Sequence, residues 1–191
     1  MTLKHALALS LTLLCALPLQ AQIPQDGLAA HWNFSPSDGP QDFAAQFMGD
    51  AFSTNTEDPI NGDYLRLDGD GDYFNAFDDS FFDELDQGWS ASAWFRPDSP
   101  PAAPTNADRA FIFETSGGFP ISLGLRHRTD DTTTIQVFTE DVNGSFTNID
   151  IPILNTHLTA WNHITITYSN NNSERILSAY LNGALAGSTS L

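Results

Sequence analysis

Three aspartates occupy alternate positions in the segment Leu65–Phe74, which reads LRLDGDGDYF. Carboxylate oxygens at Asp68, Asp70 and Asp72 are the hard ligands that Ca²⁺ prefers, and a bound cation would relieve the repulsion among them. An EF-hand loop is excluded, because Tyr73 stands where that loop needs its glycine. The Asp-Gly pairs also suit a tight turn, since they supply positive φ angles and local side-chain hydrogen bonds. We therefore predict a tight turn between two strands, with Ca²⁺ binding at the three aspartates as the alternative.

A second set of residues has the chemistry to hold a ligand by stacking and by charge. Trp89 begins a predicted strand directly after a glycine-containing loop, which would leave its ring available to the CH face of a sugar. Arg126 and Arg128 share one face of a predicted strand and could receive a carboxylate or sulfate group. The alternative is that both arginines pair with nearby acidic residues, in surface ion pairs that contribute little to stability.

Strand signals recur along the chain in place of any long helical period. They are short runs rich in β-branched and aromatic residues, separated by Gly, Asn, Asp and Pro. In Ile121–Arg128, for example, Ile121, Leu123 and Leu125 alternate with polar residues and glycine. The predicted strands are Gly27–Phe34, Tyr64–Leu67, Tyr73–Phe77, Trp89–Arg96, Ala110–Glu114, Ile121–Arg128, Thr133–Thr139, Asn162–Tyr168 and Ile176–Leu181.

These half-buried strands predict an all-β fold in which two antiparallel sheets pack face to face. The inward residues of Asn162–Tyr168 should be Ile164, Ile166 and Tyr168. Asn182-Gly183 supplies the two positive φ angles of a type I′ hairpin turn, so a further strand should follow it. A domain of this length can bury enough surface for one core without disulfides.

The first 21 residues predict an export signal. Lys4 and His5 form a short positive start, Ala6–Leu17 is apolar but too short to span a bilayer, and small residues precede a cleavage point after Ala21. A lipoprotein anchored at Cys15 is the alternative. We therefore expect residues 1–21 to be removed, residues 22–191 to form one domain, and the product to be secreted, extracellular or at the cell surface, with the periplasm also open.

The mature chain would carry six arginines against 24 acidic residues, and its only cysteine would be lost with the signal. Such a surface repels the phosphates of nucleic acid and of anionic membranes, so neither is expected as a partner. It attracts cations, including Ca²⁺, and no other apolar stretch is long enough for membrane insertion.

Several motifs in this order resemble the laminin G-like jelly rolls of the concanavalin A-like lectin/glucanase superfamily, as found in secreted bacterial proteins. They are GLAAHWNF at 27–34, LDGDGDY at 67–73, WSASAWFRP at 89–97, WNHITITY at 161–168 and YLNG at 180–183. The resemblance implies a concanavalin A-like jelly roll and non-catalytic binding of a carbohydrate or an extracellular protein, with Ca²⁺ as an optional cofactor. It also implies framework roles for Trp32, Trp94 and Trp161.

Two alternatives to a binding module remain open. Some glycoside hydrolases share this jelly roll and pair two carboxylates on one strand. Glu84-Leu85-Asp86 resembles the first half of their motif, but the second glutamate is missing, so we expect no catalysis. The other alternative is a structural or adhesion spacer. The resemblance further implies closing strands and more domains beyond Leu191, so that the isolated chain should be marginally stable.

Overall fold

Alternating apolar and polar residues make this chain a β protein. The computed structural model describes residues 34, 46–54, 63–68, 70–75, 88–99, 110–114, 121–127, 132–140, 146–171 and 174–191. Within them lie twelve strands and one short helix, α2 (Asn155–Leu158). The strands are β1 (Gln46–Met48), β2 (Phe52–Thr54), β3 (Tyr64–Arg66), β4 (Tyr73–Asn75), β5 (Gly88–Phe95), β6 (Ala110–Glu114), β7 (Ile121–His127), β8 (Thr132–Glu140), β9 (Phe146–Leu154), β10 (Asn162–Asn170), β11 (Arg175–Leu181) and β12 (Ala184–Ser190).

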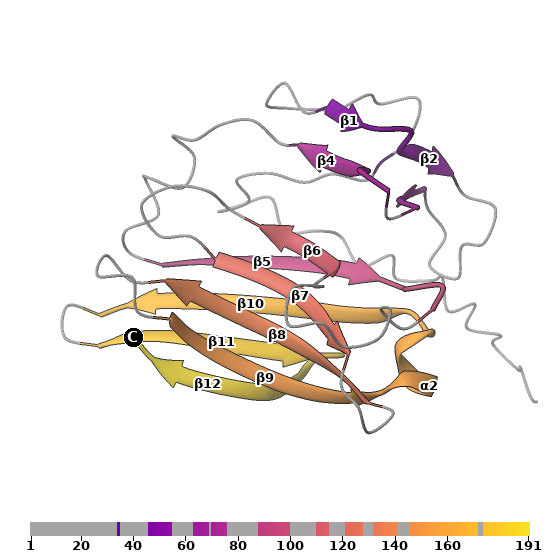
Figure 1. Cartoon of the computed structure of the whole chain (residues 1–191). Coiled ribbons are helices and arrows are strands. Elements are labelled where there is room, and N and C mark those ends of the chain that lie inside the picture. Colours follow the sequence, from indigo (N-terminus) through magenta and orange to yellow (C-terminus); the bar gives the residue numbers. More distant parts are fainter. Residues whose placement is uncertain are drawn as a thin grey trace, which may run out of the picture.

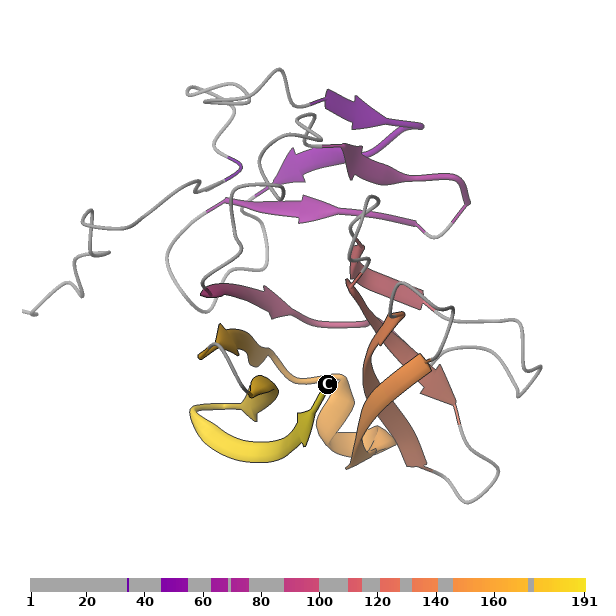
Figure 2. The ribbon, with the colours of Figure 1, turned by 90° about the vertical axis from the view of Figure 1, so that its left-hand side faces the viewer.

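Two four-stranded antiparallel sheets form the body of the molecule. Sheet I has the strand order β12-β11-β10-β5, and sheet II has the order β6-β7-β8-β9. The sheets lie in separate layers when the molecule is seen from its side (Figure 2). Strands β9 and β12 contact each other across the layers at the lower edge of Figure 1. The predicted all-β, two-sheet sandwich is confirmed.

One hydrophobic core fills the space between the two sheets. Leu123, Ile164 and Ile166 are at most 2% exposed, as the alternation predicts, and Tyr168 is also buried. Because successive side chains of a strand point to opposite faces, strands β7 to β11 contribute alternate residues to this core. Its members are Phe95, Leu123, Leu125, Ile135, Val137, Ile149, Ile151, Ile153, Leu158, Ile164, Ile166, Tyr168, Leu177 and Ala179.

The hairpin between β11 and β12 has the predicted turn. Asn182 and Gly183 have φ angles of 51° and 82°, the two positive values of a type I′ turn. The turn is tied to the start of β10, because the backbone N–H of Asn182 donates to the carbonyl of His163 at 2.7 Å. The His163 N–H in turn donates to Asn182 Oδ1 at 2.8 Å.

Two smaller antiparallel sheets, β1-β4 and β2-β3, lie above the sandwich in Figure 1. The strands β3 and β4 were predicted, but β1 and β2 were not. Aromatic side chains hold this region together: the rings of Phe34 and Phe74 meet edge to face with centroids 5.2 Å apart. Apart from Phe34, the predicted strand Gly27–Phe34 lies outside the described residues.

Strand β9 is the main element missing from the prediction. Its inward residues Ile149, Ile151 and Ile153 alternate clearly with exposed ones, but one of the exposed residues is Pro152, which argues against a strand. Proline cannot donate to a ladder and is therefore confined to edge strands or bulges. Pro152 is accommodated because β9 is the last strand of sheet II in the described part of the chain.

None of the helices that the structure describes has the length and hydropathy needed to cross a membrane.

Candidate functional site

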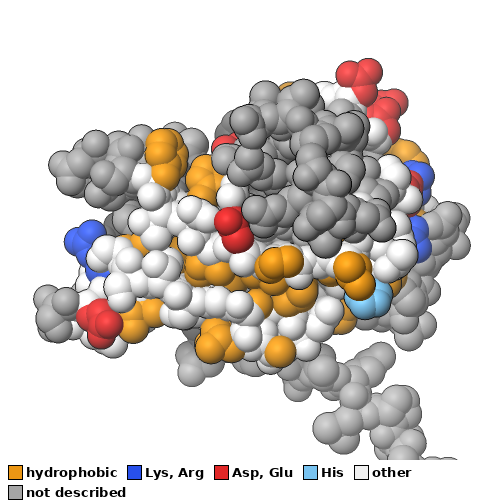
Figure 3. Space-filling view, turned by 60° about the horizontal axis from the view of Figure 1, so that its bottom comes forward, with side chains coloured by type: hydrophobic (Ala, Val, Ile, Leu, Met, Phe, Trp, Pro, Cys, Tyr) orange, Lys and Arg blue, Asp and Glu red, His pale blue; other side chains and the backbone are white. Residues whose placement is uncertain are grey.

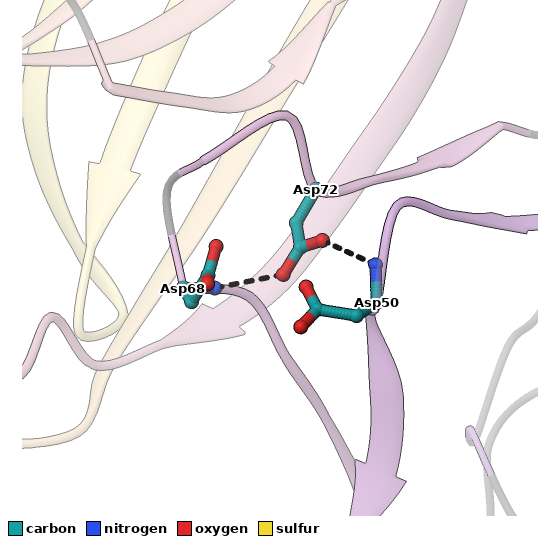
Figure 4. Close-up of side chains that lie close together, drawn as sticks. All are labelled: Asp50, Asp68 and Asp72. Carbon is teal, nitrogen blue, oxygen red and sulfur yellow. Dashed lines mark hydrogen bonds between the residues drawn. The ribbon is translucent and has the colours of Figure 1, made fainter.

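The aspartate segment forms the turn between β3 and β4 and lies against the turn between β1 and β2. The carboxylate of Asp72 accepts hydrogen bonds from the backbone N–H of Asp50 at 2.9 Å and of Asp68 at 3.0 Å (Figure 4). One side chain thereby ties the two turns together. The predicted turn, with its local side-chain hydrogen bonds, is confirmed, but β3 and β4 pair with β2 and β1 and not with each other.

Gly49 allows this close approach of the two turns. Its φ angle of +72° is one that residues with a side chain rarely adopt. A Cβ atom at this position would lie 2.3 Å from Asp72 Oδ1 and 3.1 Å from the carbonyl oxygen of Gly71. Any larger residue would therefore push the carboxylate away from the N–H groups that it binds.

Three carboxylates converge at this point, and they are not quite the predicted three. Oxygens of Asp50, Asp68 and Asp72 all lie within 4.8 Å of one another. Asp70 is not a member of this group; its backbone N–H donates to Asp68 Oδ1 at 2.7 Å. Sequence spacing could not identify Asp50, because this residue belongs to a different turn and lies far upstream.

The cluster is electrostatically strained. The hydrogen bond to Asp72, followed by the negative charges of Asp72 and Asp68, raises the pKa of Asp50 above its ordinary value of 3.8. The N–H of Asp68 has the opposite effect and holds the pKa of Asp72 below 3.8. A proton or a cation at Asp50 would relieve this repulsion, and oxygen-rich clusters of this kind suit Ca²⁺.

The outer face of sheet I is the second candidate. We use this name for the side chains of sheet I that point away from the core. They are Ser90, Ser92, Trp94, His163, Thr165, Thr167, Ser169, Ile176, Ser178, Tyr180, Leu185, Ser188 and Ser190. Most of them carry a hydroxyl group, and no Asp, Glu, Lys or Arg is among them.

Trp94 is the most prominent aromatic side chain on this face. It is 53% exposed, and its ring lies 4.8 Å from that of the paired residue His163 at an angle of 43°. The stack holds the indole in place without covering it. Tyr180 lies two strands away on the same face and is half-buried.

The tryptophan predicted to bind a ligand points the other way. Trp89 packs against the core and its ring lies 6.1 Å from that of Tyr168. Trp94, for which the resemblance implies a framework role, is exposed and does not belong to the core. The alternation of residues in β5 indicates which tryptophan faces the solvent. Trp94 lies on the same face as Ser90 and Ser92, whereas Trp89 lies on the same face as Phe95.

The structure leaves the arginine prediction open. Arg126 lies in β7 opposite Thr134, but the description does not extend to its side chain. Arg128 and the segment Glu84–Asp86 lie outside the described residues.

A shallow pocket of about 540 Å³ lies at the α2 end of the sandwich. Trp161 lines it, with its framework role supported by an edge-to-face contact with Tyr64 at 5.6 Å and by Arg96 stacked over its ring at 5.5 Å. Two polar lining residues, Asn162 and Asn182, are already hydrogen bonded to each other. The pocket therefore offers mainly apolar contacts and is the weakest of the three candidates.

Comparisons with known proteins support the fold. The laminin G-like family model of the concanavalin A-like lectin/glucanases superfamily matches residues 67–191, which include strands β4 to β12. Neither the search of curated proteins nor the search of solved structures found a match. Since the matched region covers more than half of the sequence, the chain belongs to the concanavalin A-like lectin/glucanases superfamily.

Proposed function

We propose that this protein is a secreted, non-catalytic binding module whose ligand is a carbohydrate held on the outer face of sheet I. The family is one whose members often bind carbohydrate or protein. The observation that carries the proposal is the exposed indole of Trp94 beside a hydroxyl-rich, uncharged sheet surface. Export is supported by the composition of residues 1–21.

Sugar recognition needs the two kinds of group that this face combines. The CH faces of a pyranose ring pack on an aromatic ring, and Trp94 offers one that is held by His163. Hydroxyl groups of Ser and Thr both donate and accept hydrogen bonds, so they match the hydroxyl groups of a sugar in either direction. An immobilised indole also loses little conformational freedom when a ligand binds.

The test is affinity electrophoresis of residues 22–191 in gels that contain soluble polysaccharides, with a Trp94→Ala variant. Removal of the indole should abolish retardation, because the sugar ring then has no aromatic surface on which to pack. Phe146→Ala is the matched control, since Phe146 is 66% exposed but lies on sheet II. Equal retardation of wild type and Trp94→Ala would contradict the proposal.

The alternatives give different results in the same assays. Release of reducing sugar would favour a glycoside hydrolase. Lack of any binding to sugars would favour an extracellular protein ligand or a structural spacer.

We also propose that Ca²⁺ binds at Asp50, Asp68 and Asp72 and steadies the two turns. The convergence of their carboxylates within 4.8 Å supports this proposal.

Added Ca²⁺ should raise the melting temperature of the wild type by several degrees and leave the melting temperature of an Asp50→Asn/Asp68→Asn variant unchanged. Asp70→Asn is the control, because its carboxylate is not part of the cluster, and it should respond like the wild type. An unchanged wild-type melting temperature after chelation and after Ca²⁺ addition would exclude the site.

A further inference from the structure

We infer that the ligand of the outer face of sheet I is an extended, neutral polysaccharide that lies across the strands. The inference rests on the proposed carbohydrate-binding function and specifies the class of carbohydrate. It excludes single sugars and acidic glycans as the main ligands.

The arrangement of side chains in rows carries the first part of the inference. The strand register places Ser92, Thr165, Tyr180 and Leu185 in one row across the sheet. The next row contains a hydroxyl group on each strand, from Ser90, Thr167, Ser178 and Ser188. Ser178 is only 9% exposed and its hydroxyl is hydrogen bonded to that of Ser188 at 3.0 Å, so the row reaches a ligand mainly through the other three residues. Trp94 and His163 form the row above them.

The length of each row decides between a short and an extended ligand. Neighbouring strands are about 4.8 Å apart, so a row that crosses four strands is about 14 Å long. This is longer than one pyranose ring, and the polar groups continue from one edge of the sheet to the other. A single sugar would use only a small part of the surface, whereas a polymer can contact several strands at once.

The charge of the surface decides between neutral and acidic glycans. The protein has a net charge of −17, yet none of the acidic side chains that the structure describes points outward from sheet I. Among the described residues of this face there is also no arginine or lysine to receive a sulfate or carboxylate group. An acidic polymer would therefore meet long-range repulsion and no compensating ion pair.

A protein partner fits the same surface less well. The centre of a protein interface is enriched in aromatic residues, methionine and arginine and depleted in serine. Here the centre contains Thr165, Thr167 and Ser178, with Tyr180 as its one aromatic residue. The other large groups, Trp94 and Leu185, lie on the two outer strands.

Paired ligands and paired variants test the inference. A neutral β-glucan, xylan and mannan would each be compared with its own carboxymethylated form and with its constituent monosaccharide. The wild type should bind at least one neutral polymer, bind the carboxymethylated form at least tenfold more weakly, and show no competition by the monosaccharide. Equal affinity for the neutral and charged forms, or full competition by a monosaccharide, would overturn the inference.

Thr167→Asp places a negative charge at the centre of the hydroxyl row and should weaken binding at least tenfold. Asn148→Asp is its control, because Asn148 is exposed on β9 of the other sheet. Thr165→Val/Thr167→Val keeps the shape of the surface and removes two hydroxyl groups, so binding should weaken roughly three- to tenfold. Thermal melting establishes that each variant is folded. If Thr167→Asp and Thr165→Val/Thr167→Val both bind like the wild type, the hydroxyl rows are not the site.

The results separate the inference from the proposed function. If no polymer is bound by the wild type, both fail. If Trp94→Ala abolishes binding while Thr167→Asp leaves it unchanged, the proposed function stands and the extended hydroxyl surface is wrong. A dimer in sedimentation experiments that Thr167→Asp dissociates, without polymer binding, would assign the face to a second copy of the chain.

Discussion

The side chain of Asp72 connects two turns by hydrogen bonds, and these hydrogen bonds depend on its negative charge. Its carboxylate accepts two backbone N–H groups, and these hydrogen bonds favour the ionised form, as its lowered pKa reflects. Asp50 lies beside it and experiences the opposite effect, because its own charge is opposed by Asp72 and Asp68. The two residues should therefore influence stability in different pH ranges.

We predict that, without Ca²⁺, Asp50 makes the turns more stable as the solution becomes acidic. A raised pKa in the folded state gives stability that is present below the ordinary value of 3.8 and is lost as the pH rises through the raised value. Asp72 has a lowered pKa, so its contribution is present above 3.8 and is lost only at more acidic pH.

The measurement is the difference in melting temperature between the wild type and Asp50→Asn from pH 7 to pH 3. Taking this difference removes the pH dependence that both proteins share through their other carboxylates. Asp50→Asn should be the more stable protein at pH 7, and the difference should disappear as the pH falls toward 3.8. A difference that is independent of pH would show that Asp50 does not interact with its neighbours in solution.

At the scale of single residues, sequence could predict the turn and two of the three converging aspartates, Asp68 and Asp72. It could not predict Asp50, because the contact depends on how two separate turns are brought together by β1 and β4. The sequence did contain the information that Trp89 faces the core and Trp94 the solvent. The start of a strand does not decide which face a side chain occupies, whereas the alternation of β5 does.

Among the elements, β12 depends on one glycine for its fit against β9. A Cβ atom at Gly187 would lie 2.4 Å from Cγ2 of Ile149, far closer than van der Waals contact. This methyl group is attached to a β-branched carbon and has little freedom to move away.

We therefore predict that Gly187→Ala destabilises the sandwich by about 1–3 kcal/mol through overpacking. The measurement is urea denaturation. Ile149→Ala makes room at the same point, so the double variant should lose less stability than the sum of the two single changes. Simple additivity would mean that β12 and β9 do not contact each other as described.

The long strands were predictable because each contains several periods of the alternation. Strands β5, β7, β8, β10 and β11 were placed to within two residues at either end, and β6 was placed without error. Strands β1 and β2 have three residues each, too few for a period to be recognised. Strand β9 has a clear period, but Pro152 is acceptable only at a sheet edge, and a sequence does not show which strand will be the edge.

On the scale of the whole molecule, hydrophobic side chains gather in a band across the lower side, where β9 and β12 meet (Figure 3). The net charge of −17 opposes compaction around it, because like charges repel in the folded state more than in the expanded chain.

We predict that NaCl raises the melting temperature of this protein. The screening length falls from about 30 Å at 0.01 M to about 3 Å at 1 M, so added salt removes most of the repulsion among surface carboxylates. Calorimetry at increasing NaCl should show a rise of several degrees, and choline chloride should give a similar rise if the effect is screening. A melting temperature that falls with salt would mean that attractive ion pairs, such as Arg66 with Asp98 at 2.7 Å, outweigh the repulsion.

The absence of charged groups among the outward side chains described for sheet I has a consequence for how copies of this protein would cover a fibre. Each copy would attach by its neutral flank and present its carboxylates to the solvent, so all would share one orientation. Neighbouring copies would then repel one another laterally, and the density of the coat would be set by ionic strength as well as by the number of places to attach.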